Sequence, residues 1–183
     1  MLNTKTNQFR LFQLMRKYFI IPLLPLILVA CKEINDIDDQ HHDNFEKRTV
    51  AMSTLDSLES GVSYLSVSSQ LYSLSEHKAH NFTITASIRN ISLTDTMYIT
   101  KAKYLDTNAK PLHTYFNQPI FVAPLETLEI VIDEVYHDKS TGASFIFDWK
   151  IKPKSKEPVF EGIMISTYGN QGLSFTTQGQ RID

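Results

Sequence analysis

Apolar and polar residues alternate along most of the chain, from about residue 61 to residue 182. Every second side chain of residues 82–89 is apolar, and residues 128–132 repeat the pattern. Because successive side chains of a strand point to opposite faces, this spacing predicts strands with one buried face and one wet face. Further strands are expected at residues 64–71, 97–105, 112–116, 145–149, 160–166 and 172–177, with turn-forming residues between them. About eight short strands predict an all-β fold, an antiparallel β-sandwich of two sheets.

Three large rings fall on one face of a single predicted strand, at Phe145, Phe147 and Trp149. Each ring can bury about 150–250 Å², so we expect all three in the core. An exposed aromatic shelf for a ligand is the alternative, and it is less expected because such stripes usually point inward.

A different pattern precedes the domain. Residues 18–30 form an apolar run, and the residues before it carry four basic side chains and no acidic one. A basic start followed by a short apolar stretch is typical of a secretory signal peptide, here residues 1–30. Thirteen residues are too few for a helix that crosses a bilayer, which needs about 20.

Cys31 is the only cysteine of the chain, and it directly follows Ala30, a small residue. This arrangement resembles the lipoprotein signal of bacteria, which predicts cleavage between Ala30 and Cys31 and a lipid, including palmitate, on the Cys31 sulfur. Each buried methylene contributes about 0.8 kcal/mol, so two or three acyl chains would hold the protein on a membrane. The alternatives are an ordinary cleavable signal with an accidental cysteine, or an anchor that is retained uncleaved.

The predicted location is therefore the bacterial cell envelope. Lys32 follows Cys31, and it is not the aspartate that is associated with retention in the inner membrane. We therefore favour the outer membrane, with the domain facing the periplasm or exposed at the cell surface.

Residues 31–60 begin with Cys31 and continue with many Asp, Asn and Gln, so they predict a flexible acidic tether. His41, His42 and Asp43 offer nitrogen and oxygen ligands for a divalent metal, but adjacent residues of a flexible chain organise a site poorly. Weak metal binding is the less expected reading. Residues 45–60 could also form a short amphipathic helix.

The charge balance excludes one class of partner. The leader holds four of the 18 basic residues and none of the 20 acidic ones, so the mature chain carries 14 minus 20, or −6. Nucleic-acid binding depends on clustered basic residues that neutralise phosphates, so we expect no nucleic-acid partner. The same balance argues equally against electrostatic adhesion to anionic lipid.

No arrangement of residues typical of a catalytic site stands out. His77 and His80 are expected in a polar loop, where a spacing of three sets them on opposite sides. His113 stands alone, and His137 with Asp138, Ser140 and Thr141 is expected to form a polar hairpin loop rather than a nucleophile and its base. Phosphate loops, nucleophile elbows and zinc spacings are absent from the sequence, so we expect no cofactor and no enzyme activity.

Several segments occur together in an order that resembles the bacterial family called domain of unknown function 3124. They are residues 87–90, 104–106, 142–149, 161–167 and 171–175, and the similarity covers roughly residues 61–182. The resemblance implies an exported or lipoprotein-like β domain. It implies no activity and transfers no catalytic residue.

The chain departs from that family's pattern at two places. Asn108 and Ala109 stand where the family usually has Asp-Gly, so we expect Asn108 to adopt the left-handed conformation of the turn. Ser144 stands where the family tends to have Asn, and its side chain has a shorter reach.

Together these features predict a lipid-anchored, non-enzymatic module, with residues 61–183 as its β-sandwich, that binds an envelope protein or a glycan or maintains envelope structure. The candidate partner surface is His137, Asp138, Ser140, Thr141 and Gln171. The rival hypothesis is an envelope hydrolase or metal-dependent enzyme that uses the loop histidines. Convergence of histidines with acids in a pocket would favour the enzyme, whereas an exposed apolar patch or an open sheet edge would favour the binding module.

Overall fold

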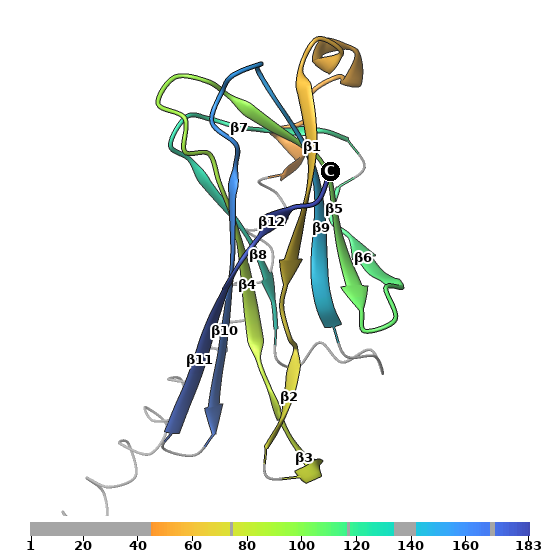
Figure 1. Ribbon diagram of the computed structural model, residues 1–183, viewed down its shortest axis with the longest axis vertical. Helices are drawn as coiled ribbons and strands as arrows, with labels where there is room; N and C mark the ends of the chain where they lie inside the picture. Colours follow the sequence, from red (N-terminus) through yellow and green to blue (C-terminus); the bar gives the residue numbers. More distant parts are fainter. Residues whose placement is uncertain (1–44, 74, 117, 134–141, 169–170) are drawn as a thin grey trace, which may run out of the picture. The chain divides into compact units, whose positions relative to one another are not determined.

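The computed structural model describes residues 45–73, 75–116, 118–133, 142–168 and 171–183, all within the compact unit His41–Asp183. Strands dominate these residues (Figure 1). A 3-10 helix, η1 (Met52–Leu55), precedes the strands β1 (Glu59–Ser66), β2 (Gln70–Ser73), β3 (Ser75–Asn81), β4 (Thr83–Arg89), β5 (Met97–Asp106), β6 (Pro111–Thr114), β7 (Ile120–Val122), β8 (Thr127–Ile132), β9 (Gly142–Ile151), β10 (Val159–Tyr168), β11 (Gln171–Gln178) and β12 (Gln180–Arg181).

The strands form two main sheets and one additional hairpin. The larger sheet has the order β12-β1-β9-β5-β6, with β7 also paired to β5, and the smaller one has the order β11-β10-β4-β8. Strands β2 and β3 pair with each other. All pairings of named strands are antiparallel. The predicted antiparallel all-β architecture is confirmed, with twelve described strands in place of about eight.

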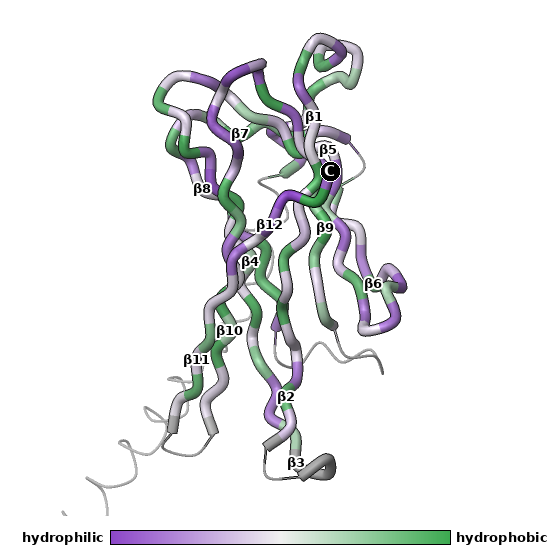
Figure 2. Tube along the Cα trace, viewed as in Figure 1, coloured by the Kyte–Doolittle hydropathy of each residue, from purple (hydrophilic) through white to green (hydrophobic). Residues whose placement is uncertain are grey.

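The two main sheets bury one shared core, and apolar residues recur along their strands (Figure 2). The rings of Phe145 and Phe147 on β9 stack with centroids 5.4 Å apart, and Phe147 stacks at 4.5 Å on Phe160 of β10. Because β9 and β10 belong to different sheets, this ring stack joins the two layers. Phe145, Phe147 and Trp149 are at most 1% exposed, which confirms their predicted place in the core.

Residues 45–60, which the sequence assigned to the tether, pack on the domain. Phe45 and Leu55 are buried, and Thr49 forms an isolated bridge with Ile120 of β7. The Val50 N–H also donates to the Pro119 carbonyl at 2.8 Å. Within these residues the expected amphipathic helix amounts to a single turn before η1 and η1 itself. The described fold therefore begins well before residue 61.

The single strand expected over residues 64–71 is divided into β1 and β2. Residues 67–69 leave the β1–β9 ladder but stay attached to the start of β9, since the N–H groups of Val67 and Ser69 donate to the carbonyls of Ala143 and Gly142 at 3.0 and 3.2 Å. The Ser69 carbonyl in turn accepts a hydrogen bond from the Phe82 N–H at 2.9 Å. The chain then forms the β2–β3 hairpin, so His77 and His80 lie in β3 and not in the expected polar loop.

The turn after β5 differs from expectation in one residue. Ala109, and not Asn108, has the positive φ of 61°. The Asp106 carboxylate accepts from the N–H groups of Asn108 and Lys110, both at 2.8 Å, and this holds residue 108 inside the turn and leaves residue 109 to reverse the chain. The hydrogen bonds that the Asp106 carboxylate accepts therefore override the intrinsic preference of Asn for the left-handed region.

Candidate functional site

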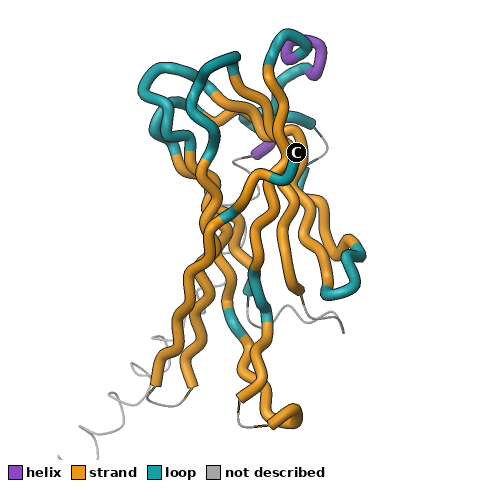
Figure 3. The backbone as a smooth tube through the Cα atoms, in the orientation of Figure 1, coloured by secondary structure: helices purple, strands orange, loops and turns teal. Residues whose placement is uncertain are grey.

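Strand β11 forms an edge of the four-stranded sheet, and it is the clearest candidate for a binding surface. Within the described part of the chain, β11 pairs along its length with β10 alone. The pairing runs from Gln171 opposite Tyr168 to Gln178 opposite Glu161. The β10–β11 pair runs beyond the region where the larger sheet covers the smaller one (Figures 1 and 3). A hydrogen bond from the Thr177 hydroxyl to the Ser66 carbonyl, at 2.6 Å, links β11 to β1 of the larger sheet.

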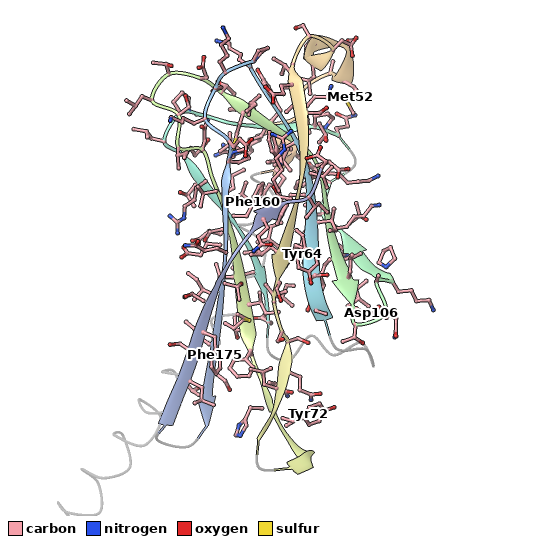
Figure 4. The ribbon with its side chains drawn as sticks, viewed as in Figure 1. Met52, Tyr64, Tyr72, Asp106, Phe160 and Phe175 are labelled. Atoms are coloured by element: carbon pink, nitrogen blue, oxygen red, sulfur yellow. The ribbon has the colours of Figure 1, made fainter. Side chains whose placement is uncertain are left out.

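The inner face of β11 carries apolar side chains that remain exposed. Phe175 is paired with the buried Met164, and Leu173 with the buried Ser166, so both side chains project to the core side of the sheet. Phe175 is nevertheless 44% exposed and Leu173 39% exposed. The Phe175 ring, which is labelled in Figure 4, contacts the Phe82 ring edge to face, with the ring centroids 5.6 Å apart. An apolar surface that is continuous with the core is thus open at this edge.

The backbone of β11 adds hydrogen-bonding groups to the same edge. The Gly179 N–H donates to the Phe160 carbonyl at 2.8 Å, which fixes the alternation of the ladder. In an antiparallel pair, every second residue bonds to the partner strand and the residues between them point outward. Residues 173, 175 and 177 therefore bond to β10, and Gly172, Ser174 and Thr176 present their N–H and C=O groups at the free edge.

The neighbouring β2–β3 hairpin also exposes apolar side chains. Leu71 is 37% exposed and Tyr72 is 64% exposed, and both lie on β2 (Figure 4). Hairpins β2–β3 and β10–β11 extend from the same end of the sandwich (Figure 1).

A polar cluster fixes the base of the β2–β3 hairpin. Burial raises the pKa of the Tyr104 phenol, and a hydrogen bond with Ser69 lowers it by a smaller amount. The Ser69 hydroxyl also accepts from the Gly142 N–H at 2.9 Å. Gly142 is required beneath Tyr104, because an added Cβ would lie under 3.0 Å from three atoms of the phenol. The cluster connects β5, β9 and the residue before β2. Its role is therefore to hold these strands together rather than to bind a ligand.

Most residues singled out from the sequence lie outside the described residues. These are Ala30, Cys31, His41, His42, Asp43, His137, Asp138, Ser140 and Thr141. Gln171 is described, and it opens β11 opposite Tyr168. The candidate partner surface and the open edge therefore share this one residue.

The described histidines are not brought together. His80 is paired with Leu71 in the β2–β3 hairpin, whereas His113 lies on β6 of the larger sheet, with its ring 4.6 Å from that of Tyr115. Across residues 45–183, apart from the undescribed gaps, no group of three or more His, Cys, Asp or Glu side chains is placed to hold a metal ion. Nor does any helix of this part have the length and apolar character needed to cross a membrane.

The segments that carried the family resemblance make specific contacts in this fold. Asn90 is buried and donates to the carbonyls of Asp95 and Val122, and Tyr104 covers Gly142. Residues 171–175 form the first part of β11, which pairs with β10. The model of the family described as "Protein of unknown function (DUF3124)" matches residues 60–182. The chain belongs to the DUF3124 family. This confirms the resemblance inferred from the sequence.

This DUF3124 domain was also compared with curated proteins and with solved structures. No curated protein matches it. A crystal structure of Thermotoga maritima 1070 is similar at a TM-score of 0.40 and 13% identity, over 66% of this chain and 92% of that one.

Proposed function

We propose that this DUF3124 protein is a lipid-anchored lipoprotein of the bacterial cell envelope whose β domain binds a protein partner at the β11 edge. The supporting observation is the open edge itself, where Leu173 and Phe175 expose an apolar inner face beside backbone groups that no described strand pairs. Outward N–H and C=O groups are complementary to one further strand, and the alternating side chains give that strand a preferred register.

The partner is an extended segment of an envelope protein. An added strand beside β11 would cover the Phe175 ring and satisfy the outward groups of residues 172, 174 and 176. Its apolar residues would alternate so that every second one faces the core side, because β11 presents its own apolar residues with that period. A protein segment supplies such a backbone, whereas a glycan does not.

Photocrosslinking in the native organism tests the binding site. A crosslinking residue replaces Leu173 in the full chain, and Val131, which is 42% exposed on β8, gives the control position. We expect one partner to be captured at position 173 and not at position 131. Capture of the same partner at both positions with equal yield would refute the edge as its site.

Proline substitutions separate backbone pairing from side-chain contact. Ser174→Pro removes an N–H that points to the free edge, so it spares the ladder with β10 and is expected to abolish capture at position 173. The matched control Ser174→Ala keeps the N–H and is expected to capture normally. Undiminished capture by a folded Ser174→Pro chain would exclude strand addition.

The anchor has its own test. Cells fed labelled palmitate are expected to label the wild-type chain and not Cys31→Ala, because the thioether requires the Cys31 sulfur. An unlabelled wild-type product would exclude the lipid anchor and leave the β11 edge unaffected.

A further inference from the structure

Three loops meet at the end of the domain that lies opposite the β10–β11 turn. They join β4 to β5, β7 to β8, and β9 to β10, and they lie side by side (Figure 1). The Leu125 N–H donates to the Ser92 carbonyl at 3.2 Å, and the Asn90 N–H donates to the Glu126 carbonyl at 2.9 Å. Lys152 forms an ion pair of 2.7 Å with Asp95. The loops therefore form one connected surface.

Large apolar side chains project from two of these loops. Leu93 is 79% exposed, Leu125 is 64% exposed and Ile91 is 46% exposed. We call these three residues the loop tip. Hydropathy along the backbone shows apolar positions in the β4–β5 and β7–β8 loops next to the hydrophilic β9–β10 loop (Figure 2). Exposed apolar residues that gather in this way mark a surface for a partner or a membrane.

The backbone holds Leu125 outward in an unfavourable conformation. Its φ of 61° is left-handed, which L-residues with a Cβ adopt at an energetic cost. Flanking hydrogen bonds enforce it, since the Glu126 N–H donates to the Ala123 carbonyl at 3.1 Å and the Ala123 N–H donates to the Glu126 carboxylate at 2.8 Å. Gly or Asn would satisfy this turn with less strain, so the turn geometry does not explain a leucine.

The charges of these loops that are not in ion pairs are positive. The acids Asp95, Glu126 and Glu157 are each in an ion pair, with Lys152, Arg48 and Arg181 respectively. Lys154 and Lys156 of the β9–β10 loop are exposed and form no ion pair within the described residues. Two exposed ammonium groups therefore lie on a loop that is bonded to the β4–β5 loop through Asp95, although the predicted mature chain as a whole carries −6.

The described chain begins close to the same loops. Arg48 forms an ion pair of 2.6 Å with Glu126, the neighbour of Leu125. Phe45, the first described residue, lies three positions earlier. The 13 residues between Cys31 and Phe45 span at most about 45 Å, so a chain held at residue 31 keeps this end of the domain within reach of the bilayer.

We propose that the loop tip docks on the phospholipid surface to which the chain is attached. Ile91, Leu93 and Leu125 enter the interfacial region, and Lys154 and Lys156 face anionic headgroups. The inference uses the membrane attachment of the proposed function but not the chemistry at Cys31, because an uncleaved leader would attach the chain equally well. Docking at this end turns the β10–β11 end, with its open edge, away from the bilayer and toward partners.

Depth-dependent fluorescence quenching tests the docking. The full chain is purified from membranes and placed in vesicles of phosphatidylethanolamine and phosphatidylglycerol, with an environment-sensitive dye on Leu93→Cys. The control dye is on Thr107→Cys, in the exposed turn between β5 and β6. Wild-type chain treated with the same dye reports any labelling of Cys31. Lipids with a quencher on the acyl chain are expected to remove at least about half of the emission at position 93 and almost none at position 107.

Variants identify the groups responsible. With the dye on Ile91→Cys, the change Leu125→Asn is expected to abolish quenching while the domain keeps or gains stability, because Asn tolerates the left-handed turn. Val131→Asn removes an exposed apolar side chain of β8 and is expected to leave quenching unchanged. The double change Lys154→Glu, Lys156→Glu is expected to reduce quenching in anionic vesicles and to have little effect in neutral ones.

Each outcome decides the proposal. Absence of quenching at positions 91 and 93, or equal quenching at position 107, would overturn it whatever is found at Cys31. Quenching at positions 91 and 93 in a chain whose Cys31 carries no lipid would keep the docking surface and refute the lipid anchor alone.

Discussion

A single methyl group at Gly61 is predicted to disrupt the packing around Trp149. Gly61 on β1 is directly paired with Trp149 on β9, and an added Cβ would lie under 3.0 Å from three atoms of the indole. Trp149 is 1% exposed, and its Nε1–H donates to the Ser63 hydroxyl at 2.9 Å. The guanidinium of Arg181 lies over the ring, 5.1 Å from its centroid. The ring has no free space, so Gly61→Ala must shift it or the backbone.

The expected cost follows from two separate effects. Forcing extra volume into a packed core costs about 1–3 kcal/mol. Moving the indole also weakens the Trp149–Ser63 hydrogen bond, and both partners are buried, so its loss costs about 1–2 kcal/mol more. We expect Gly61→Ala to lower the free energy of unfolding by about 2–5 kcal/mol, which for a domain of this size lowers Tm by roughly 5–15 °C.

Urea unfolding followed by tryptophan emission measures this directly, because Trp149 is the only tryptophan of the chain. The variant is expected to unfold at lower urea, and its folded emission is expected to shift to longer wavelength as the indole loses its buried environment. Gly172→Ala is the matched control. Nothing lies within 4 Å of the position its Cβ would take, so it is expected to be neutral or to stabilise by about 0.5 kcal/mol.

Equal urea midpoints for Gly61→Ala, Gly172→Ala and the wild type would refute the reasoning. So would a destabilised Gly61→Ala whose folded emission is identical to that of the wild type, because the ring would then not be the group that moves.

Three other substitutions are expected to have measurable effects. Ala109→Gly removes the strain of a left-handed alanine and is expected to raise the free energy of unfolding by about 0.5–1 kcal/mol in urea titrations, with no gain if the turn is unstrained. Asn90→Ala leaves two carbonyls and one N–H without their partners, so a loss of about 2–4 kcal/mol is expected by calorimetry, with Asn90→Asp as a control that keeps only the acceptor. A hydrogen bond from Lys152 lowers the pKa of Asp95 below 3.8, so its contribution to stability is present above that pH and is lost as the pH falls through the lower folded value. Asp95→Asn is expected to weaken the acid dependence of the unfolding midpoint below about pH 4, and an unchanged pH profile would contradict this.

Local sequence predicted most of the long strands and the direction of their side chains. Residues 82–89 and 145–149 alternate regularly, and the structure buries the predicted apolar face of each strand. On the face of residues 82–89 that was expected to be wet, Ser87 is buried as well, and its hydroxyl donates to the Glu129 carboxylate of β8. The ordered motifs also identified the DUF3124 family. Period and turn chemistry act over a few residues, so they can be read without knowing the fold.

The sequence did not show which strands pair with one another or which strand lies at a sheet edge. Leu173 and Phe175 have the same alternation as core residues, and only the place of β11 at an edge leaves them exposed. The division of residues 64–71 into β1 and β2 depends on distant contacts of Ser69 with Gly142 and Phe82. The left-handed residue of the β5–β6 turn was likewise decided by the carboxylate of Asp106.

The sequence alone determined an antiparallel β domain and its family, and it predicts an exported-type leader that ends before Cys31, because these depend on composition, periodicity and short motifs. The tertiary structure alone decided which strand is left at an open edge and which loops gather Ile91, Leu93 and Leu125 at one end. Both features arise from pairings between residues far apart in the chain, where the same local pattern is compatible with a buried or an exposed position.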